Sequence, residues 1–288
     1  MTLSPPPLSL TTTNHDRDSA GMTYVYPVIS RRAGGVSIGV NLNPNNACNW
    51  LCIYCQVPDL ARGGPPAINL ALLEQELRCL LVDIIEGDFM TRSVPEAMRR
   101  LNDIALSGNG EPTSAVEFPR VIEIIGRVLA DFKLTGKIKL VLITNGSLAR
   151  KSYVQDGLRK MAQLNGEVWF KFDRASRTGL SLVNDTETDP ERHYQRMKTV
   201  AHLCPTWIQS CFFKLDDKAP EADEIDAWLN MLARAKTENL PLHGVLLYGL
   251  ARASQQTEAH RLSSLPGDWM LGLAKRIEEL GWSVRVSI

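Results

Sequence analysis

The chain is 288 residues long and 44% hydrophobic, which is ample to bury a core and excludes an intrinsically disordered protein. Its 32 basic and 32 acidic side chains give a formal net charge of zero. This balance argues against nucleic-acid binding through a broad basic surface, although it allows a local basic patch. The sequence has no run of about 18 apolar residues that would span a membrane, so no membrane partner is expected.

Residues 1–22 are rich in proline, serine and threonine and contain neither a basic n-region nor a continuous apolar h-region. This composition is typical of a mobile tail rather than of a secretory signal. We therefore expect a disordered tail over residues 1–22, a single domain over residues 23–288 and a cytoplasmic location. In that compartment the six cysteines are expected to remain reduced rather than to form disulfides.

Beyond the tail, short apolar runs alternate with segments of helical periodicity. Among these segments, Leu70–Ile85 and Val116–Leu129 predict helices packed against a sheet, and Asp189-Pro190 is a typical helix start. The predicted strands are Val36–Leu42, Asp103–Leu106, Ile138–Ile143, Glu167–Phe172, Thr206–Phe213, Gly244–Tyr248 and Trp282–Ile288.

The later strands begin at intervals of roughly 30 residues or more, which is the length of one βα unit. Six such units and a last strand indicate an α/β fold, namely a partial (β/α)6 TIM-type barrel. The active sites of such barrels lie at the carboxyl ends of the strands, so the residues that directly follow the apolar runs are candidates for function. The polar stretch Ala253–Asp268 after the sixth strand is long enough to form a lid.

Three cysteines, Cys48, Cys52 and Cys55, follow the first predicted strand with the spacing C-x3-C-x2-C. Such a loop can supply three thiolates to one [4Fe–4S] cluster, which normally takes four. No fourth cysteine is within reach in the sequence, so one iron would stay open to an external ligand, as in catalytic metal sites. The alternatives are a zinc loop or three unrelated thiols, but the nearest candidates for a fourth zinc ligand, His15 and Cys79, are badly placed.

Glycines and polar residues follow the second and third predicted strands. Gly108 and Gly110 would let the backbone approach a ligand closely, and Glu111 supplies a carboxylate beside them. The same stretch would also serve as a plain turn before a helix. Asn145-Gly146, which ends the third strand, is either a turn or a contact to a bound molecule.

Polar side chains also end the next three predicted strands. Lys171 and Asp173 share a face of the fourth, where the aspartate either caps the next helix or contacts a ligand. Gln209 and Cys211 share a face of the fifth, and we expect the buried glutamine to line the pocket and the cysteine to be a packed thiol. Arg252 follows the sixth strand and would either neutralise an anionic substrate or lie on the surface. Our candidates for catalytic contacts are Lys171, Asp173 and Arg252.

The cysteine spacing, with Tyr54 before the last cysteine, resembles the signature of the radical S-adenosylmethionine (SAM) superfamily, and the resemblance extends from about Tyr24 onward. It implies that Cys48, Cys52 and Cys55 ligate a [4Fe–4S] cluster whose open iron binds the amino and carboxylate groups of SAM. It also implies that an electron delivered through the cluster cleaves SAM to methionine and a 5′-deoxyadenosyl radical, which abstracts hydrogen from a substrate.

The resemblance also implies contacts to SAM. Tyr54 would help hold the adenine, and Gly108, Gly110 and Glu111 match the stretch that binds the SAM amino group. Two strand-end residues that are expected to face the same pocket complete the candidates for cofactor binding, namely Asn145 and Gln209.

A narrower resemblance rests on the segment Tyr26–Gly39 together with the motifs Gly-Asn-Gly-Glu-Pro, Thr-Asn-Gly, Lys-Phe-Asp and Leu-Ala-Arg. These features are similar to the radical SAM subgroup related to the wyosine-base tRNA synthetase, which rebuilds a methylated guanine with a carbon fragment from pyruvate. The Schiff-base lysine of that chemistry would be Lys171. Arg31 and Arg32 would bind a phosphate or an anionic substrate, or pair with carboxylates at the barrel rim.

The sequence therefore predicts a radical SAM enzyme that acts on an unidentified small-molecule substrate, with a reductant protein such as a flavodoxin or ferredoxin as its partner. An alternative is radical modification of a tRNA base, which the neutral charge supports only weakly. An alternative of another class is a non-catalytic iron–sulfur or zinc-binding module, which would not need the loop Gly108–Glu111 beside the cysteines.

Overall fold

The computed structural model of the chain describes residues 10–11, 20–30 and 34–288. Arg31 and Arg32, together with most of the segment predicted as a tail, lie outside these described residues. Within that segment, Leu10 is buried in the hydrophobic core, and its backbone N–H donates to the carbonyl of Ser93 at 2.9 Å. No helix in the described part of the chain is long and apolar enough to cross a membrane.

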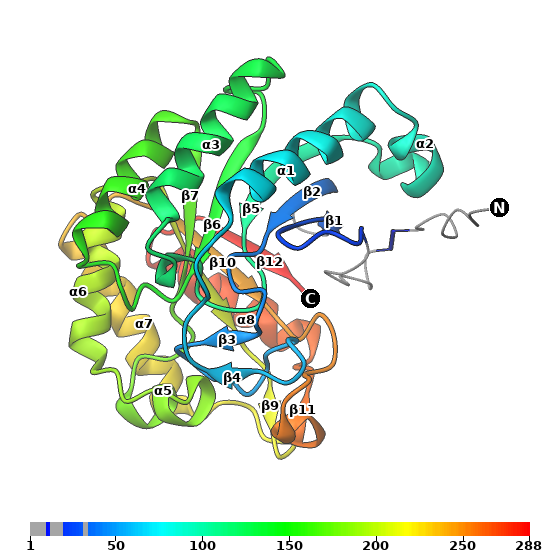
Figure 1. The fold of residues 1–288 in the computed structure, drawn as a ribbon. Helices are drawn as coiled ribbons and strands as arrows, with labels where there is room; N and C mark the ends of the chain where they lie inside the picture. The colour runs from blue at the N-terminus through cyan, green and yellow to red at the C-terminus, as the bar shows by residue number, and fades with distance from the viewer. Residues whose placement is uncertain (1–9, 12–19, 31–33) are drawn as a thin grey trace.

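One open, curled sheet of eight strands forms the centre of the molecule, and helices pack on its outer face (Figure 1). The strand order is β1-β2-β5-β6-β7-β8-β10-β12, and all neighbours are parallel except the antiparallel pair β1–β2. Six βα units run from β2 to α8, and β12 is the last strand. The predicted α/β class and the partial (β/α)6 TIM-type barrel are confirmed.

The elements agree with the predicted ones to within a few residues, and α1 has the predicted bounds. The sheet strands are β1 (Val25–Ser30), β2 (Gly35–Val40), β5 (Leu101–Leu106), β6 (Lys139–Thr144), β7 (Gly166–Lys171), β8 (Thr206–Cys211), β10 (Leu242–Tyr248) and β12 (Val284–Ser287). The helices are α1 (Leu70–Ile85), α2 (Phe89–Ser93), α3 (Phe118–Asp131), α4 (Ser152–Gln163), α5 (Arg177–Asn184), α6 (Pro190–Ala201), α7 (Ala222–Thr237) and α8 (Gly267–Glu279).

Two short ribbons, which the hydrophobic pattern did not predict, lie outside the main sheet. They are formed by β3 (Ala47–Cys48) with β4 (Ala61–Arg62), and by β9 (Lys214–Leu215) with β11 (Leu262–Ser263). Figure 1 shows both ribbons in its lower part, at the end of the barrel opposite α2. The first ribbon carries Cys48, so it belongs to the same end of the barrel as the cysteine loop.

Strand β1 is the sheet strand that the sequence pattern missed, and its position explains why. Pro27 has no N–H for a ladder hydrogen bond, so a strand that contains it is expected only at the edge of a sheet. Tyr26 pairs with Gly39 of β2, and a Cβ atom on Gly39 would lie 2.1 Å from the Tyr26 ring. The glycine therefore makes room for the tyrosine inside the barrel.

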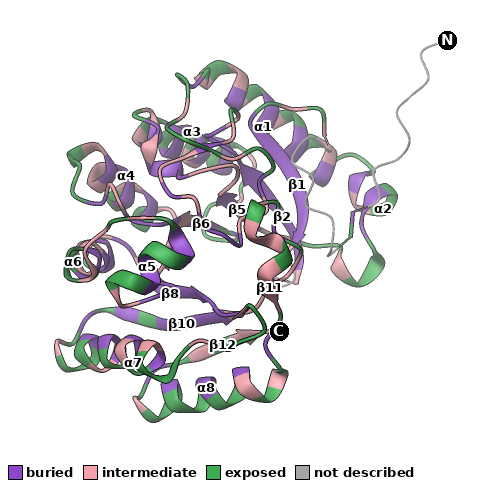
Figure 2. Cartoon of the chain, turned by 90° about the horizontal axis from the view of Figure 1, so that it is seen from below, coloured by how far each residue is buried: buried purple, intermediate pink, exposed green. Residues whose placement is uncertain are grey.

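The hydrophobic core lies between the sheet and the helices around it. Strands β2 and β8 are buried along their whole length, as expected for parallel strands covered on both faces. Helix α3 buries an apolar stripe that includes Val121, Ile125 and Val128, and Figure 2 shows the same division into buried and exposed faces on the other long helices. Burial of apolar area at about 25 cal/mol per Å² is the main stabilising contribution in such a core.

His193 of α6 is a buried histidine that joins three parts of the fold. Its Nε2–H donates to the carbonyl of Lys171 at the end of β7 at 2.9 Å. Its ring packs against Phe170 and Phe172 of the same segment and against Trp50 of the cysteine loop, with ring centroids 4.5 to 5.3 Å apart. Burial lowers the pKa of His193 from 6.5 to about 4, so the ring is neutral at physiological pH.

This burial makes the stability of the fold depend on pH. As the pH falls below 6.5, the unfolded chain binds a proton at His193 whereas the folded chain does not until about pH 4. The stabilising contribution is complete above pH 6.5 and is lost as the pH falls, by about 2 kcal/mol between pH 7 and pH 5. Urea unfolding at pH 7 and pH 5 should show this decrease in the free energy of unfolding. In His193→Phe the difference between the two pH values should be smaller by about the same 2 kcal/mol. An unchanged pH dependence in the variant would contradict the assignment.

Candidate active site

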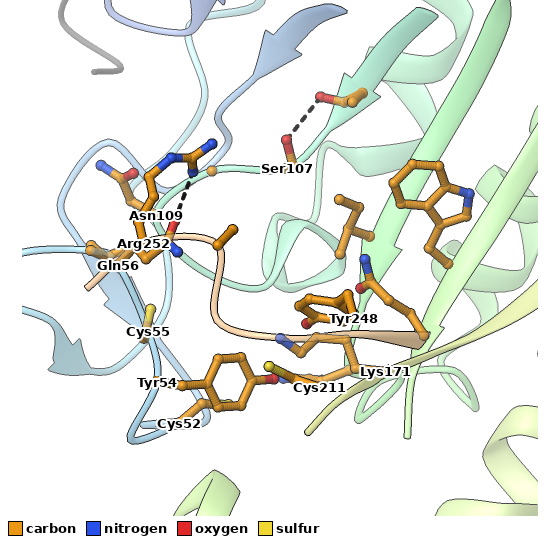
Figure 3. Close-up of a pocket in the computed structure, with 18 of the residues that line it drawn as sticks. Cys52, Tyr54, Cys55, Gln56, Ser107, Asn109, Lys171, Cys211, Tyr248 and Arg252 are labelled. Carbon is orange, nitrogen blue, oxygen red and sulfur yellow. Dashed lines mark hydrogen bonds between the residues drawn. The ribbon is translucent and has the colours of Figure 1, made fainter. Parts of the chain in front are cut away.

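A cavity of about 300 Å³ opens at the carboxyl ends of the strands, beside the cysteine loop (Figure 3). In the close-up, Tyr54 points from the cysteine loop towards Lys171 and Cys211, which end β7 and β8. All but one of the predicted site residues line this cavity, and the exception is Asp173. Those that line it are Cys48, Cys52, Tyr54, Cys55, Gly108, Gly110, Glu111, Asn145, Lys171, Gln209 and Arg252.

The cysteine loop is docked on the last turn of α5. The backbone N–H of Ile53 donates to the carbonyl of Val183 at 3.0 Å, and the side-chain amide of Asn184 donates to the sulfur of Cys52 at 3.2 Å. Arg62 of β4 links the two segments. Its guanidinium donates to the carbonyl of Asn49 and to both the carbonyl and the carboxylate of Asp185 at 2.7 to 2.9 Å.

The segment after β10 holds the same loop from another side. The hydroxyl of Ser254 donates to the carbonyls of Ile53 and Cys55 at 2.7 and 3.1 Å. The amide of Gln256 donates to the carbonyls of Cys55 and Val57 at 3.1 and 2.8 Å. This segment is the polar stretch predicted as a lid, and in the structure its first residues hold the cysteine loop in place.

Asp173 lies one layer behind the cavity wall, is only 1% exposed and acts as a common acceptor. One carboxylate oxygen accepts from the hydroxyl of Tyr54 at 2.6 Å and from the amide of Asn184 at 2.8 Å. The other accepts from the backbone N–H of Cys211 at 2.8 Å. The structure therefore places Asp173 as a positioning residue that joins the cysteine loop, α5 and β8.

The loop after β5 is packed tightly on the chain that leads into the cysteines. Gly108 has a φ of +148°, and a Cβ atom there would lie 2.5 Å from the side chain of Asn41. A Cβ atom on Gly110 would lie 2.2 Å from the carbonyl oxygen of Ala47. The carbonyl of the Asn41 side chain accepts from the backbone N–H of Asn109 at 3.1 Å, so the two loops are fixed to each other.

Glu111 joins the ends of β5 and β6 beneath the cysteine loop. One carboxylate oxygen accepts from the backbone and hydroxyl of Thr113 and from the hydroxyl of Thr144, and the other accepts from the backbone N–H of Asn145 at 2.7 Å. Burial raises the pKa of Glu111, and these hydrogen bonds act in the opposite direction. The side chain of Asn145 continues the network, because its amide donates to Asn49 of the cysteine loop at 2.8 Å.

Three further polar side chains line the cavity, those of Lys171, Gln209 and Arg252. Burial alone would lower the pKa of Lys171. The electrostatic attraction of Tyr248 and Asp173 outweighs this effect and holds the pKa well above its usual value. The ammonium lies 4.7 Å from the centre of the Tyr54 ring. The Oε1 atom of Gln209, a residue only 2% exposed, has no hydrogen-bond partner.

Arg252 lies at the side of the cavity nearest the end of the cysteine loop. Its guanidinium donates to the side chain of Gln56 at 2.9 Å, as the dashed line in Figure 3 marks. Asn109 is labelled beside this pair in the same view, and its Oδ1 atom is buried without a partner.

The three clustered cysteines are free thiols on the wall of one cavity. Burial raises the pKa of Cys48 to about 11 and that of Cys52 to about 12, so both are protonated until a metal displaces the proton. Among the described residues, no three histidine, cysteine, aspartate or glutamate side chains are grouped closely enough to hold a single metal ion. An iron–sulfur cube takes each cysteine on a different iron, so its ligands need not meet at one point.

Some residues of the site were missed in the sequence. Asn184, Ser254 and Gln256 contact the cysteine loop but stand in ordinary polar surroundings in the chain, without a motif. Deeper in the cavity, the hydroxyl of Ser37 donates to the carboxylate of Asp103 between β2 and β5. Both are polar residues within otherwise apolar strands, and this interruption of the apolar pattern could have identified them as cavity residues from the sequence.

The open, curled sheet with its outer helices has the fold of solved radical SAM enzymes. A radical SAM methyltransferase from Sphaerobacter thermophilus has a TM-score of 0.58 at 10% identity, covering 91% of this chain and 68% of its own. The structure of TYW1 with a lysine-pyruvate adduct bound has a TM-score of 0.57 at 17% identity, covering 84% and 73%. A mutant of spore photoproduct lyase has a TM-score of 0.50 at 11% identity, covering 83% and 73%.

These similarities confirm, at the level of the fold, the resemblance to radical SAM proteins. No protein-family model matches the chain. Two UPF0026 proteins are similar in sequence: that of Methanocaldococcus jannaschii is 26% identical over 53% of this chain and 44% of its own, and that of Synechocystis sp. is 29% identical over 46% and 43%. The GTPase Obg of Brachyspira hyodysenteriae is 27% identical over 46% of this chain and 17% of its own. The chain thus spans less than half the length of each of these relatives.

The close packing of Gly110 against Ala47 generates a prediction for the site. Gly110→Ala should displace the segment that leads into Cys48, because the new methyl group would overlap the Ala47 carbonyl. We expect a loss of about 1–3 kcal/mol in the free energy of unfolding and faster reaction of the clustered thiols with a thiol reagent.

Gly64→Ala is the matched control, since nothing lies within 4 Å of a Cβ atom at that position. It should leave both the free energy of unfolding and the thiol reactivity unchanged. Equal behaviour of the two variants would contradict the packing described for the loop.

Proposed function

We propose that the protein is a radical SAM enzyme that acts on a small-molecule substrate bound in the cavity. The observation that carries this proposal is the convergence of three free thiols and two buried, unpartnered acceptors on one cavity at the carboxyl end of the barrel. Enzymes of this barrel type have their active sites at that end. A protein that only carried electrons would not need a ligand cavity next to the cysteines.

Cys48, Cys52 and Cys55 are the residues that would hold a [4Fe–4S] cluster, with one iron left for SAM. When bound, the cluster supplies the electron that cleaves SAM to methionine and a 5′-deoxyadenosyl radical. The chain holds the three sulfurs in place through the contacts of α5 and of the segment 254–256 with the cysteine loop. The amide that Asn184 directs at Cys52 is a donor, which suits a thiolate.

The unpartnered acceptors fit the donors that SAM presents, namely its amino group and the exocyclic amine of its adenine. Gln209 Oε1 and Asn109 Oδ1 are the two buried acceptors on the cavity wall. Glu111 also keeps acceptor capacity, because its Oε2 atom receives one hydrogen bond and each carboxylate oxygen offers two lone pairs. The glycines on either side of Asn109 let its loop pack closely on Asn41 and Ala47, so that Asn109 is held in the cavity wall.

Lys171 is a charged donor on the cavity wall and would bind an anionic group of SAM or of the substrate. The elevated pKa of Lys171 keeps its amine protonated at neutral pH, so the side chain acts as a cation and hydrogen-bond donor. TYW1 has been solved with a lysine-pyruvate adduct, and the same use of Lys171 would first require loss of this proton. Arg252, on the side of Gln56, provides a second positive charge for the substrate.

The proposed reaction needs an electron donor, for which a reductant protein such as a flavodoxin or ferredoxin is the expected partner. A tRNA substrate is the alternative version of the same proposal, with the base inserted into the cavity.

The test is the cleavage of SAM by the protein after anaerobic reconstitution with iron and sulfide. With dithionite and SAM, the wild-type protein should form 5′-deoxyadenosine, measured by liquid chromatography and mass spectrometry. Cys52→Ser should lose at least about 100-fold of this activity together with the iron-dependent absorbance, because a cluster ligand is removed.

Cys79→Ser is the control, because Cys79 is an exposed thiol on α1 that does not line the cavity. It should retain the iron content and the cleavage rate. A wild-type protein that assembles the cluster but forms no 5′-deoxyadenosine would overturn the proposal and favour a non-catalytic iron–sulfur module.

A further inference from the structure

The last residue of α5, Asn184, lies between a candidate cluster ligand and a buried carboxylate. Its side-chain Nδ2 donates to the sulfur of Cys52 at 3.2 Å and to the carboxylate of Asp173 at 2.8 Å. The residue is fully buried, with an exposed fraction of 0%. The contact to sulfur links residues 132 positions apart in the chain, so it depends on the fold rather than on the motif.

The orientation of this amide follows from its neighbours. Both groups that Nδ2 faces are acceptors when ionised, a thiolate and a carboxylate, so turning the amide over would set its oxygen against two negative charges. The Oδ1 atom has no partner, although it is buried. A buried acceptor without a partner is unfavourable, so the two hydrogen bonds that the amide donates must offset this cost.

The position of Asn184 is also fixed from both sides. Its neighbour Val183 accepts from the backbone of Ile53, the residue after Cys52. On the other side, Asp185 ends the helix in the left-handed region with a φ of 45° and is held by Arg62. The amide therefore meets the sulfur of Cys52 with little freedom, which is the condition for a directional hydrogen bond.

We infer that Asn184 is a positioning residue that orients the sulfur of Cys52 and, by donating to it, raises the reduction potential of the bound cluster. This inference rests on the proposed function. Hydrogen bonds to cysteine sulfurs are one of the factors that set the potentials of iron–sulfur clusters, because they stabilise the more negatively charged reduced form. Reduction adds one electron, taken from the titrant, and neither makes nor breaks a bond in the protein.

The test compares the reconstituted wild-type protein with Asn184→Leu and Asn184→Ala in a redox titration followed by electron paramagnetic resonance. Both variants remove the donor, but leucine keeps the number and branching of the side-chain heavy atoms whereas alanine leaves a cavity. A common shift of the midpoint potential to a more negative value is therefore due to the lost hydrogen bond. Variants that fold by circular dichroism but bind less iron per chain also support the assignment, since the amide is then needed to place the sulfur.

Leu182→Ala is the control, because this side chain is 49% exposed on the same helix, and its potential and iron content should equal those of the wild type. Wild-type values for both quantities in the two Asn184 variants would overturn the inference and leave the proposed function intact. A wild-type protein that binds no cluster would overturn both, so the two failures are distinguishable.

Discussion

The cysteine loop has almost no regular structure of its own, so the hydrogen bonds that hold it must come from distant parts of the chain. Apart from the two residues of β3 and the turn in which Cys55 N–H donates to the carbonyl of Cys52, the loop backbone bonds to Val183 at the end of α5, to residues 254–256 after β10, and to Arg62. The contacts from α5 and from the last βα loop exist only when the sheet curls far enough to bring these two segments to the cysteine loop. The geometry of the three sulfurs thus depends on the completed fold.

A second layer of buried polar groups connects this loop to the strands. Asp173 joins Tyr54, Asn184 and the backbone of β8, and Glu111 joins the ends of β5 and β6. Buried carboxylates are tolerated only when several donors face them, and both of these meet that condition. Two acceptors, on Gln209 and Asn109, are left without partners on the cavity wall. The two carboxylates with several hydrogen-bond donors therefore support the site, whereas the two acceptors without partners would bind a ligand.

The barrel was largely predictable from the sequence because its strands are continuous apolar runs at βα spacing. Strand β1 was missed because Pro27 breaks the pattern, and the two-residue ribbons are too short to give one. The cysteines and the glycine loop were found because their spacing is local. Asn184 and Gln256 were not, because their partners lie 132 and about 200 residues away and no local pattern encodes such a contact. The sequence identified Asp173 as a candidate site residue, but only the folded structure shows that it lies behind Tyr54 rather than on the cavity wall.

The proposed function requires that the three clustered cysteines hold a cluster with one iron open to SAM. The most direct measurement is the electron paramagnetic resonance spectrum of the dithionite-reduced, reconstituted protein, recorded with and without SAM. SAM should change the signal of the reduced cluster, because it binds to the open iron. A cluster spectrum that is the same at saturating SAM as without it would contradict an open iron that binds SAM.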